Sequence, residues 1–272
     1  DTFVENAKKL TIDKNGKNAL DPGFDPENID TYGVTFGKWW AIYMPLVLSS
    51  GGDYLNADGT ATGMDSPEAI NAMQKMADLI WVHHVSPTPI ASQTMPGLSE
   101  SIATNKVAMS INGQWTNSDL MADGVEYNVA VLPKIGSKAK TVMTAGCLSI
   151  LDTPKKEAAW EFFKYMCSPG AVSALEKSGL WLPSVKSGYT EEYLKEMITD
   201  KHPANYYESI CLPMLDGTAE PPTTSWVVNF SKINDVLTPA LDPVWAGESS
   251  YADAIRGAIS QLNAEVKGRR DK

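Results

Sequence analysis

The spacing of hydrophobic residues predicts an amphipathic helix over residues 155–166. Ala159, Phe162, Phe163 and Met166 fall at i, i+3, i+4 and i+7, and lysines and glutamates fill the opposite face. This period is that of a helix with one apolar side, here expected to lie on a sheet.

A short apolar run precedes this helix, and a second helix with recognisable start and stop residues follows it. Residues 147–151 have the length of a buried strand, and the turn sequence Asp-Thr-Pro ends the run. Ser168 and Pro169 suit the cap and first position of the next helix, and Gly179 stands where a helix ends.

Further strands and helices are expected along the chain, and the part that follows Pro183 is expected to be helical. Two prolines, Pro239 and Pro243, are expected to interrupt the helix that begins near Trp226. The other expected strands are 32–36, 107–111 and 127–133, and the other expected helices are 2–10, 39–50, 66–81, 190–198, 203–212 and 250–266.

Composition and charge narrow the class of protein. The chain has 272 residues, of which 43% are hydrophobic, enough for one large domain or two lobes. A net charge of −10 argues against nucleic acid and anionic membranes as partners, because both require a basic face. No membrane span and no signal peptide is seen in the sequence.

Motifs of metal and catalytic sites are missing from the sequence. Cys147, Cys167 and Cys211 lack metal-type spacing, and we expect buried, unpaired thiols. No phosphate-binding loop, nucleophile elbow or zinc-protease motif occurs. We therefore expect no metal and no cofactor, although paired carboxylates of a glycoside hydrolase would leave no such motif.

Two ordered groups of motifs carry a family resemblance. The strand with Gly146 is followed by a helix containing A-x-x-F, by Ser-Pro-x-Ala from Ser168 and by Gly179 to Pro183. Residues 105–115 contain N-K, a strand with A-M, and then N-G-x-W. Their order resembles family 1 extracellular solute-binding proteins, the sugar-capturing components of ABC importers, and the resemblance covers nearly the whole chain.

The resemblance implies a periplasmic-binding-protein-like type II fold with two α/β lobes. Residues 1–145 and 184–272 would form the second lobe, and 146–183 the remaining part of the first lobe. The opening helix at 2–10 matches a segment well inside the family's proteins, so we expect an N-terminally shortened chain with an incomplete first lobe. Weak or absent sugar binding by this chain would follow.

Tryptophans are the candidate ligand contacts. Trp39 and Trp40 are adjacent on a helix and point about 100° apart, so at least one should reach a surface or cleft; the alternative is that both are core or interface residues. Trp115 follows an Asn-Gly turn at the carboxyl end of a strand, where open α/β sheets bind ligands. By the resemblance, Trp226 also faces the sugar.

The resemblance further places Gly146 and Cys147 on the cleft wall, where small residues let backbone groups approach a ligand. It implies a monomer that captures a mono- or oligosaccharide and presents it to a membrane permease. The location would be extracellular, either periplasmic or lipid-anchored. The alternatives are a carbohydrate-active enzyme with the same tryptophans, and the same fold binding a non-sugar such as a phosphorylated polyol.

Overall fold

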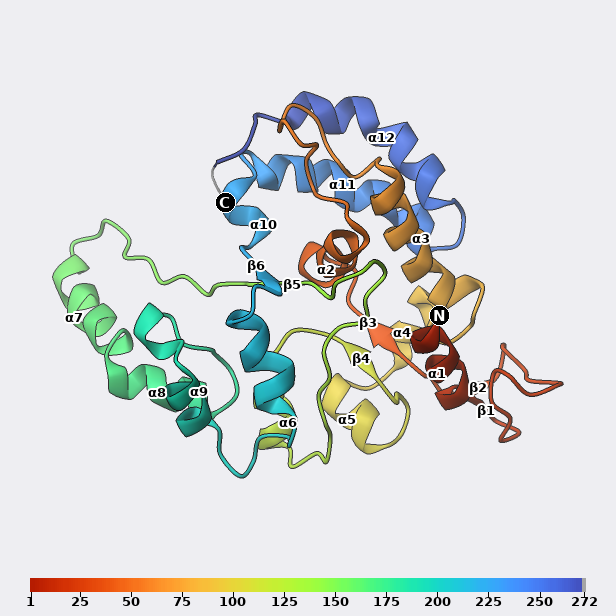
Figure 1. Ribbon diagram of the computed structural model, residues 1–272, viewed down its shortest axis with the longest axis horizontal. Coiled ribbons are helices and arrows are strands. Elements are labelled where there is room, and N and C mark those ends of the chain that lie inside the picture. Colours follow the sequence, from red (N-terminus) through yellow and green to blue (C-terminus); the bar gives the residue numbers. More distant parts are fainter. Residues whose placement is uncertain (271–272) are drawn as a thin grey trace. The chain divides into compact units, whose positions relative to one another are not determined.

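The computed structural model describes residues 1–270. The molecule is mainly helical (Figure 1), and the strands within the described residues form three pairs. The helices are α1 Thr2–Leu10, α2 Trp40–Ser50, α3 Pro67–Trp81, α4 Pro89–Thr94, α5 Leu98–Ala103, α6 Thr116–Ala122, α7 Lys156–Met166, α8 Pro169–Lys177, α9 Glu191–Met197, α10 Thr223–Trp226, α11 Phe230–Trp245 and α12 Tyr251–Glu265. Short 3-10 or π turns are η1 Lys186–Gly188, η2 Tyr207–Cys211 and η3 Leu212–Met214.

The strands are short. β1 Ile12–Asp13 pairs antiparallel with β2 Ile29–Thr31, and β5 Thr141–Val142 pairs with β6 Ala219–Glu220. β3 Thr35–Phe36 runs parallel to β4 Ser110–Ile111, with Phe36 opposite Ile111. A parallel pair requires a long crossover. Here the crossover contains α2 to α5, so residues 75 positions apart meet at one strand edge.

The chain folds into two compact units. Unit 1 comprises Asp1–Asn112, Leu132–Met143 and the chain from Glu220 onward, and unit 2 comprises Gly113–Val131 and Thr144–Ala219. Residues 146–183 lie wholly in unit 2. Residues 113–131 and 184–219 also lie in unit 2, although the predicted lobes group them with 1–145. The division into lobes therefore stays a prediction with boundaries that differ from those of the units.

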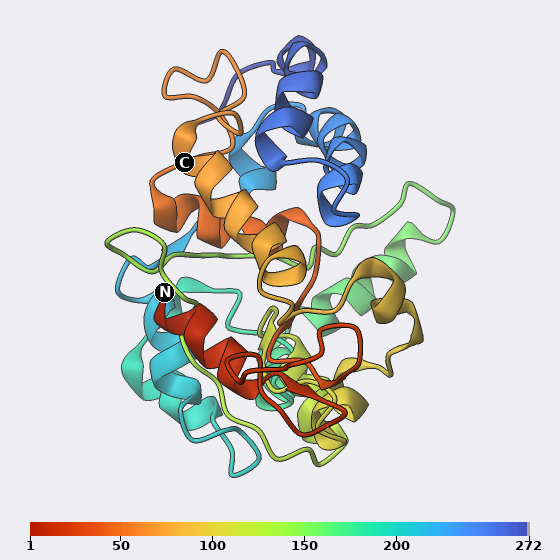
Figure 2. The same cartoon turned by 90° about the vertical axis from the view of Figure 1, so that its right-hand side faces the viewer.

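Four helices enclose the core of unit 1. α2 packs on α3, and α11 packs on α12, which also contacts α3; the blue helices α11 and α12 lie side by side in both views (Figures 1 and 2). Side-chain caps start two of these helices, because the Ser66 hydroxyl accepts the Ala69 N–H at 3.2 Å and Ser250 accepts the Asp253 N–H at 3.2 Å. Both helix starts agree with the sequence prediction.

Thr11 attaches α1 to the adjoining extended chain. Its hydroxyl donates to the Ala7 carbonyl at 2.8 Å and accepts the Gly33 N–H at 3.0 Å. A Cβ added at Gly33 would collide with the Ala7 carbonyl oxygen. Position 33 therefore requires glycine because the two backbones approach too closely for a side chain.

Unit 2 has a smaller core. Its fully buried members are Leu194 and Met197 of α9, together with Tyr206 and Cys211. The Thr190 hydroxyl caps α9 by accepting the Tyr193 N–H at 3.2 Å. α8 ends as predicted, with Gly179 in the left-handed region at φ +76°.

Two predicted strands are wrong. Residues 127–133 and 147–151 have extended or irregular backbone, and no described segment forms a ladder with either of them. The Val129 carbonyl instead accepts the Ser209 hydroxyl at 3.3 Å, and the Asn128 side-chain oxygen accepts the Asn205 N–H at 3.4 Å. An apolar run becomes a strand only when a partner strand satisfies its backbone groups.

The predicted interruption by Pro239 and Pro243 is also wrong. α11 continues through both prolines from Phe230 to Trp245. The two prolines, spaced four apart, are not among the buried residues of α11, whereas Ile233, Leu237 and Leu241 pack into the core. The packed face therefore compensates for the backbone hydrogen bonds that the prolines remove.

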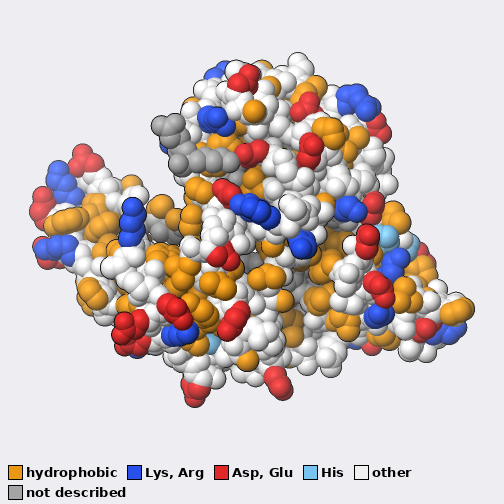
Figure 3. All heavy atoms as spheres, in the orientation of Figure 1, with side chains coloured by type: hydrophobic (Ala, Val, Ile, Leu, Met, Phe, Trp, Pro, Cys, Tyr) orange, Lys and Arg blue, Asp and Glu red, His pale blue; other side chains and the backbone are white. Residues whose placement is uncertain are grey.

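α7 forms as predicted, but its apolar side is not packed on a sheet. None of its residues is buried, and Phe162 and Tyr165 are both 63% exposed. The rings of Trp160 and Phe163 stack on each other at 5.6 Å. Figure 3 shows hydrophobic side chains at the surface over α7, among charged ones. Within residues 1–270, no helix has the length and apolar character needed to cross a bilayer.

The exposed side of α7 generates a first prediction. Replacing Phe162 and Tyr165 together by Gln should lower the fluorescence of bound 8-anilinonaphthalene-1-sulfonate and leave the unfolding temperature within about 3 °C, because exposed residues contribute little to stability. Ile90→Gln, on an isolated exposed residue of α4, is the matched control and should not change the dye signal. A large drop in unfolding temperature for the double variant would show that this face is packed.

Candidate functional site

An aromatic row runs through unit 1. We define it as Trp39, Trp40, Phe230 and Tyr54, whose rings contact one another in that order. The ring centroids are 5.7 Å apart for Trp39 and Trp40, 5.5 Å for Trp40 and Phe230, and 5.1 Å for Phe230 and Tyr54. The first two contacts are edge-to-face, the arrangement that aromatic quadrupoles favour.

The row leads from the surface into the core. Trp39 is 43% exposed, Trp40 is half-buried, and Tyr54 is fully buried. α2 begins at Trp40 with Trp39 as its cap residue, and the two rings stand at 79° to each other. The sequence prediction that the two tryptophans cannot share one core is thus confirmed.

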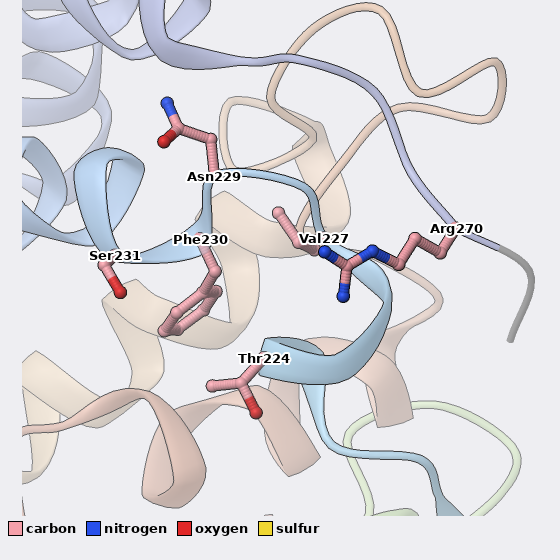
Figure 4. Close-up of a pocket in the computed structure, with 6 residues that line it drawn as sticks. All are labelled: Thr224, Val227, Asn229, Phe230, Ser231 and Arg270. Carbon is pink, nitrogen blue, oxygen red and sulfur yellow. The ribbon is translucent and has the colours of Figure 1, made fainter. Parts of the chain in front are cut away.

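A hollow of about 260 Å³ lies at the start of α11, beside the aromatic row (Figure 4). We call it the Arg270 pocket. It is lined by Thr224, Val227, Asn229, Phe230, Ser231 and Arg270. Phe230 is thus shared with the aromatic row, and hydroxyl groups and a guanidinium stand around its ring. An aromatic face with a few polar groups around it is typical of small-molecule sites.

A second hollow, of about 220 Å³, lies where the parallel strands β3 and β4 end. Gly37 and Asn112, which directly follow these strands, both line it. The carboxyl ends of parallel strands are the usual position of ligands in α/β folds. Lys38 follows Gly37, and its burial lowers the pKa of its ammonium group, while the charge of Asp242 opposes that shift.

Trp115 belongs to unit 2, where its loop is held by Gln114. The Gln114 amide donates to the Leu180 carbonyl at 2.7 Å and accepts from the Tyr206 hydroxyl at 3.3 Å. A Cβ added at Gly113 would overlap the Trp115 ring, so the Asn-Gly turn requires its glycine. Trp115 itself is half-buried.

Trp226 requires a correction. It is only 3% exposed and belongs to the core of unit 1, because α10 turns its ring inward among Val227, Ile233 and their neighbours. A stacking platform must offer an open ring face, and this residue offers none. Trp226 is therefore a core residue and leaves the set of candidate stacking residues.

Gly146 and Cys147 lie in unit 2 and are exposed. A Cβ added at Gly146 would lie 3.8 Å from the Trp181 ring, an ordinary contact, so neither crowding nor backbone conformation demands glycine there. Among the six predicted site residues, the rings of Trp39 and Trp40 contact each other. The contacts of Gly146 and Cys147 with a ligand stay predictions.

Sequence reasoning missed Phe230 and Arg270. Phe230 lies four residues after Trp226. This spacing could have drawn attention to Phe230 if the helix had been expected to begin at Phe230. Nothing in the sequence near Arg270 indicated a place in this site, because Arg270 reaches the site by pairing with the Trp226 segment, which is distant in the sequence. In residues 1–270, no group of three or more His, Cys, Asp or Glu side chains is arranged to hold a metal ion.

The contrast between Trp226 and Trp39 generates a second prediction. Trp226→Ala should lower the free energy of unfolding by about 3–5 kcal/mol, because it leaves a cavity in the core. Trp39→Ala should cost less than about 1 kcal/mol, because much of that ring is already in water. Urea unfolding followed by far-ultraviolet circular dichroism measures both, and equal losses would show that the aromatic row is purely structural.

The cysteines generate a third prediction. Cys147 and Cys167 are exposed, so the expectation of buried thiols is wrong for these two and confirmed for Cys211. Burial first, and then the charge of Glu208, raise the pKa of the Cys211 thiol to about 12. Ellman's reagent at pH 8 should therefore titrate two thiols in the folded chain and a third only in guanidinium chloride, since the thiolate is the reactive form.

A Cys147→Ser variant should leave one fast thiol, and Cys211→Ser should leave two. Rapid reaction of Cys211 in the folded chain would contradict its burial beside Tyr206.

Known proteins show what the chain is similar to. It is 21% identical over 258 residues to the maltotriose-binding protein of Pyrococcus abyssi, covering 92% of this chain and 49% of that relative. The maltose/maltodextrin-binding domain MalE of Bdellovibrio bacteriovorus, bound to maltotriose, superposes with a TM-score of 0.73 at 20% identity, covering 97% of this chain and 65% of that one. Maltose-bound MalE3 of T. maritima gives 0.70 at 22% identity, covering 86% and 60%.

These structures have the two-lobe type II periplasmic-binding-protein fold, and this α/β chain shares it. The chain spans about half the length of the curated relative and less than two thirds of these structures. The family model for bacterial extracellular solute-binding proteins matches residues 1–173, which is more than half of the chain. The chain therefore belongs to the family of bacterial extracellular solute-binding proteins.

Proposed function

We propose that this chain is part of a protein that captures a carbohydrate outside the cell and delivers it to the permease of an ABC importer. The observation that carries the proposal is the exposed ring of Trp39, at the open end of an aromatic row that reaches a pocket with polar walls. An indole face packs on the apolar C–H face of a sugar ring, and polar groups meet its hydroxyls.

The relatives support a sugar over other solutes. Their names and titles refer to maltotriose, to maltose and, for a Thermotoga lettingae protein of 22% identity, to alpha-D-tagatose. The matched family consists of solute-binding proteins, and nothing in the comparisons supports the alternative of a glycoside hydrolase.

The mechanism proposed is a population shift. A sugar that contacts both lobes only when they are closed stabilises the closed state by its difference in affinity for the two states. The permease would recognise that closed state. Trp39, Trp40 and Trp115 would stack on sugar rings, with Gly146 and Cys147 lining the wall and letting backbone groups approach.

The protein would act as a monomer outside the cell, either in a periplasm or anchored by a lipid. The family name supports the extracellular location. The net charge of −10 argues against nucleic acid as the ligand.

Binding of maltotriose to the 272-residue chain, followed by ligand-detected NMR, gives a fourth prediction. We expect a Kd in the millimolar range, corresponding to about 4 kcal/mol, because part of the two-lobe site is contributed elsewhere in the longer relatives. Trp39→Ala should weaken binding roughly tenfold, the loss expected for one stacking contact.

Trp160→Ala is the matched control, because that ring is also half exposed but lies on α7 and contacts Phe163 rather than the aromatic row. It should bind maltotriose as the parent chain does. Release of glucose or maltose during the titration would overturn the proposal in favour of an enzyme. Equal affinity of the parent chain and the Trp39 variant would remove the aromatic row as the site.

A further inference from the structure

We propose that the Arg270 pocket is an anion subsite that receives an acidic substituent, a carboxylate or a phosphate, of the captured carbohydrate. The inference rests on the proposed function and specifies the ligand of that site. It follows from the charge of the pocket, from the way Arg270 is held, and from the donors that face the hollow.

The charge of the pocket is opposite to that of the chain as a whole. Arg270 is the one charged residue among the six that line the hollow, in a chain of net charge −10. Within residues 1–270 its guanidinium forms no ion pair, whereas Arg256 pairs with Asp253 at 2.6 Å. A guanidinium offers paired N–H donors whose geometry matches a carboxylate or a phosphate.

Backbone hydrogen bonds hold Arg270 at the pocket. Its N–H donates to the Trp226 carbonyl at 2.7 Å, and the Val228 N–H donates to the Gly268 carbonyl at 3.0 Å. Val227 and Arg269 form an antiparallel bridge between these bonds. The exposed Arg270 is thus held by a short ladder to the buried segment Trp226–Val227, and little conformational entropy of the backbone remains to be lost on binding.

Hydroxyl and backbone donors face the same hollow. Thr224 and Ser231 line it, and neither hydroxyl is hydrogen-bonded to another group among the described residues. Phe230 and Ser231 are the first two residues of α11, where backbone N–H groups lack acceptors within the helix. The first turn of this 16-residue helix contains no acidic residue, so its positive end is not neutralised locally.

The side chain of Asn229 is hydrogen-bonded to Glu265. Asn229, the cap residue of α11, makes no side-chain cap, and its amide donates to the Glu265 carbonyl at 2.9 Å and to the Glu265 carboxylate at 3.0 Å. In Figure 4 the Asn229 side chain points away from Thr224 and from the ring of Phe230. The Asn229 amide is therefore hydrogen-bonded to the end of α12 and not to a group that lines the hollow.

The position of the pocket suits a substituent on a stacked sugar. Phe230 belongs both to the pocket and to the aromatic row, 5.5 Å from the Trp40 ring. A sugar ring packed against Phe230 would lie beside Arg270, because both residues line the same hollow. The pocket volume of about 260 Å³ is too small for a trisaccharide but accommodates one such group with its water.

The experiment compares glucuronate, glucose 6-phosphate, glucose and inorganic phosphate by ligand-detected NMR titration of the full chain. We expect at least one acidic sugar to bind about tenfold more tightly than glucose, with a difference that shrinks as sodium chloride is raised. R270Q should reduce the acidic sugars to the affinity of glucose and leave glucose unchanged. R256Q, which removes an arginine of α12 paired with Asp253, should change nothing.

A second pair of variants separates a loss of binding from a loss of folding. Thr224→Val and Ser231→Ala should each weaken the acidic sugars a fewfold, at an unchanged unfolding temperature, because both side chains are outside the core. The carboxylate and phosphate arms identify which acidic group the pocket takes.

The outcomes separate this inference from the proposed function. Equal affinity for glucose and both acidic sugars, or an equal effect of R270Q on all three, would overturn the anion subsite and leave carbohydrate capture intact. Failure of every sugar while phosphate still binds in an Arg270-dependent manner would uphold the subsite and reject carbohydrate capture. Failure of all four ligands would overturn both.

Discussion

The burial of α2 is the constraint on which unit 1 depends. Most of its residues, from Ala41 to Val47, are buried, and the helix has no polar side to turn toward water. A helix that is apolar all round must be enclosed by other elements. α3 packs on it directly and the α11–α12 pair completes the core, so elements from both ends of the chain are needed to cover one segment. The start of α2 is thereby fixed, and Trp39 and Trp40 with it.

Burial separates the aromatic residues of the core from Trp39, which is partly exposed. Tyr43, Tyr54 and Tyr251 are buried around α2, and loss of water raises the pKa of all three hydroxyls. The Tyr251 hydroxyl donates to the Met64 carbonyl at 2.9 Å. In the aromatic row, Trp39 is the residue that reaches the surface. The same helix start that closes the core therefore leaves the ring of Trp39 at the surface.

Helices were predictable from the sequence because their determinants are local. Ser66, Thr190 and Ser250 each cap the helix that their position indicates, and the apolar period of 155–166 is that of α7. Strands at 127–133 and 147–151 were not predictable, because a strand depends on a partner elsewhere in the chain. The prediction that prolines interrupt α11 was wrong for a related reason. Tertiary packing of the helix outweighs the local energetic cost of the prolines.

In the candidate site, too, features set by neighbouring residues were predictable and features set by distant residues were not. Adjacency alone indicated that Trp39 or Trp40 must leave the core, whereas the burial of Trp226 depends on how α10 meets α11. Phe230 and Arg270 join the site through contacts between positions 40, 230 and 270, which no spacing in the sequence reveals. Residues that meet across long separations are the part of a site that single-sequence reasoning cannot reach.

The hydroxyl of Thr11 donates to the Ala7 carbonyl and accepts the Gly33 N–H, so it couples positions 11 and 33, which are 22 residues apart. Loss of that hydroxyl would strand a buried amide, and any side chain at position 33 would push the opening helix away. Position 33 therefore accepts only glycine, whereas position 11 can accept serine, which keeps the bridging oxygen.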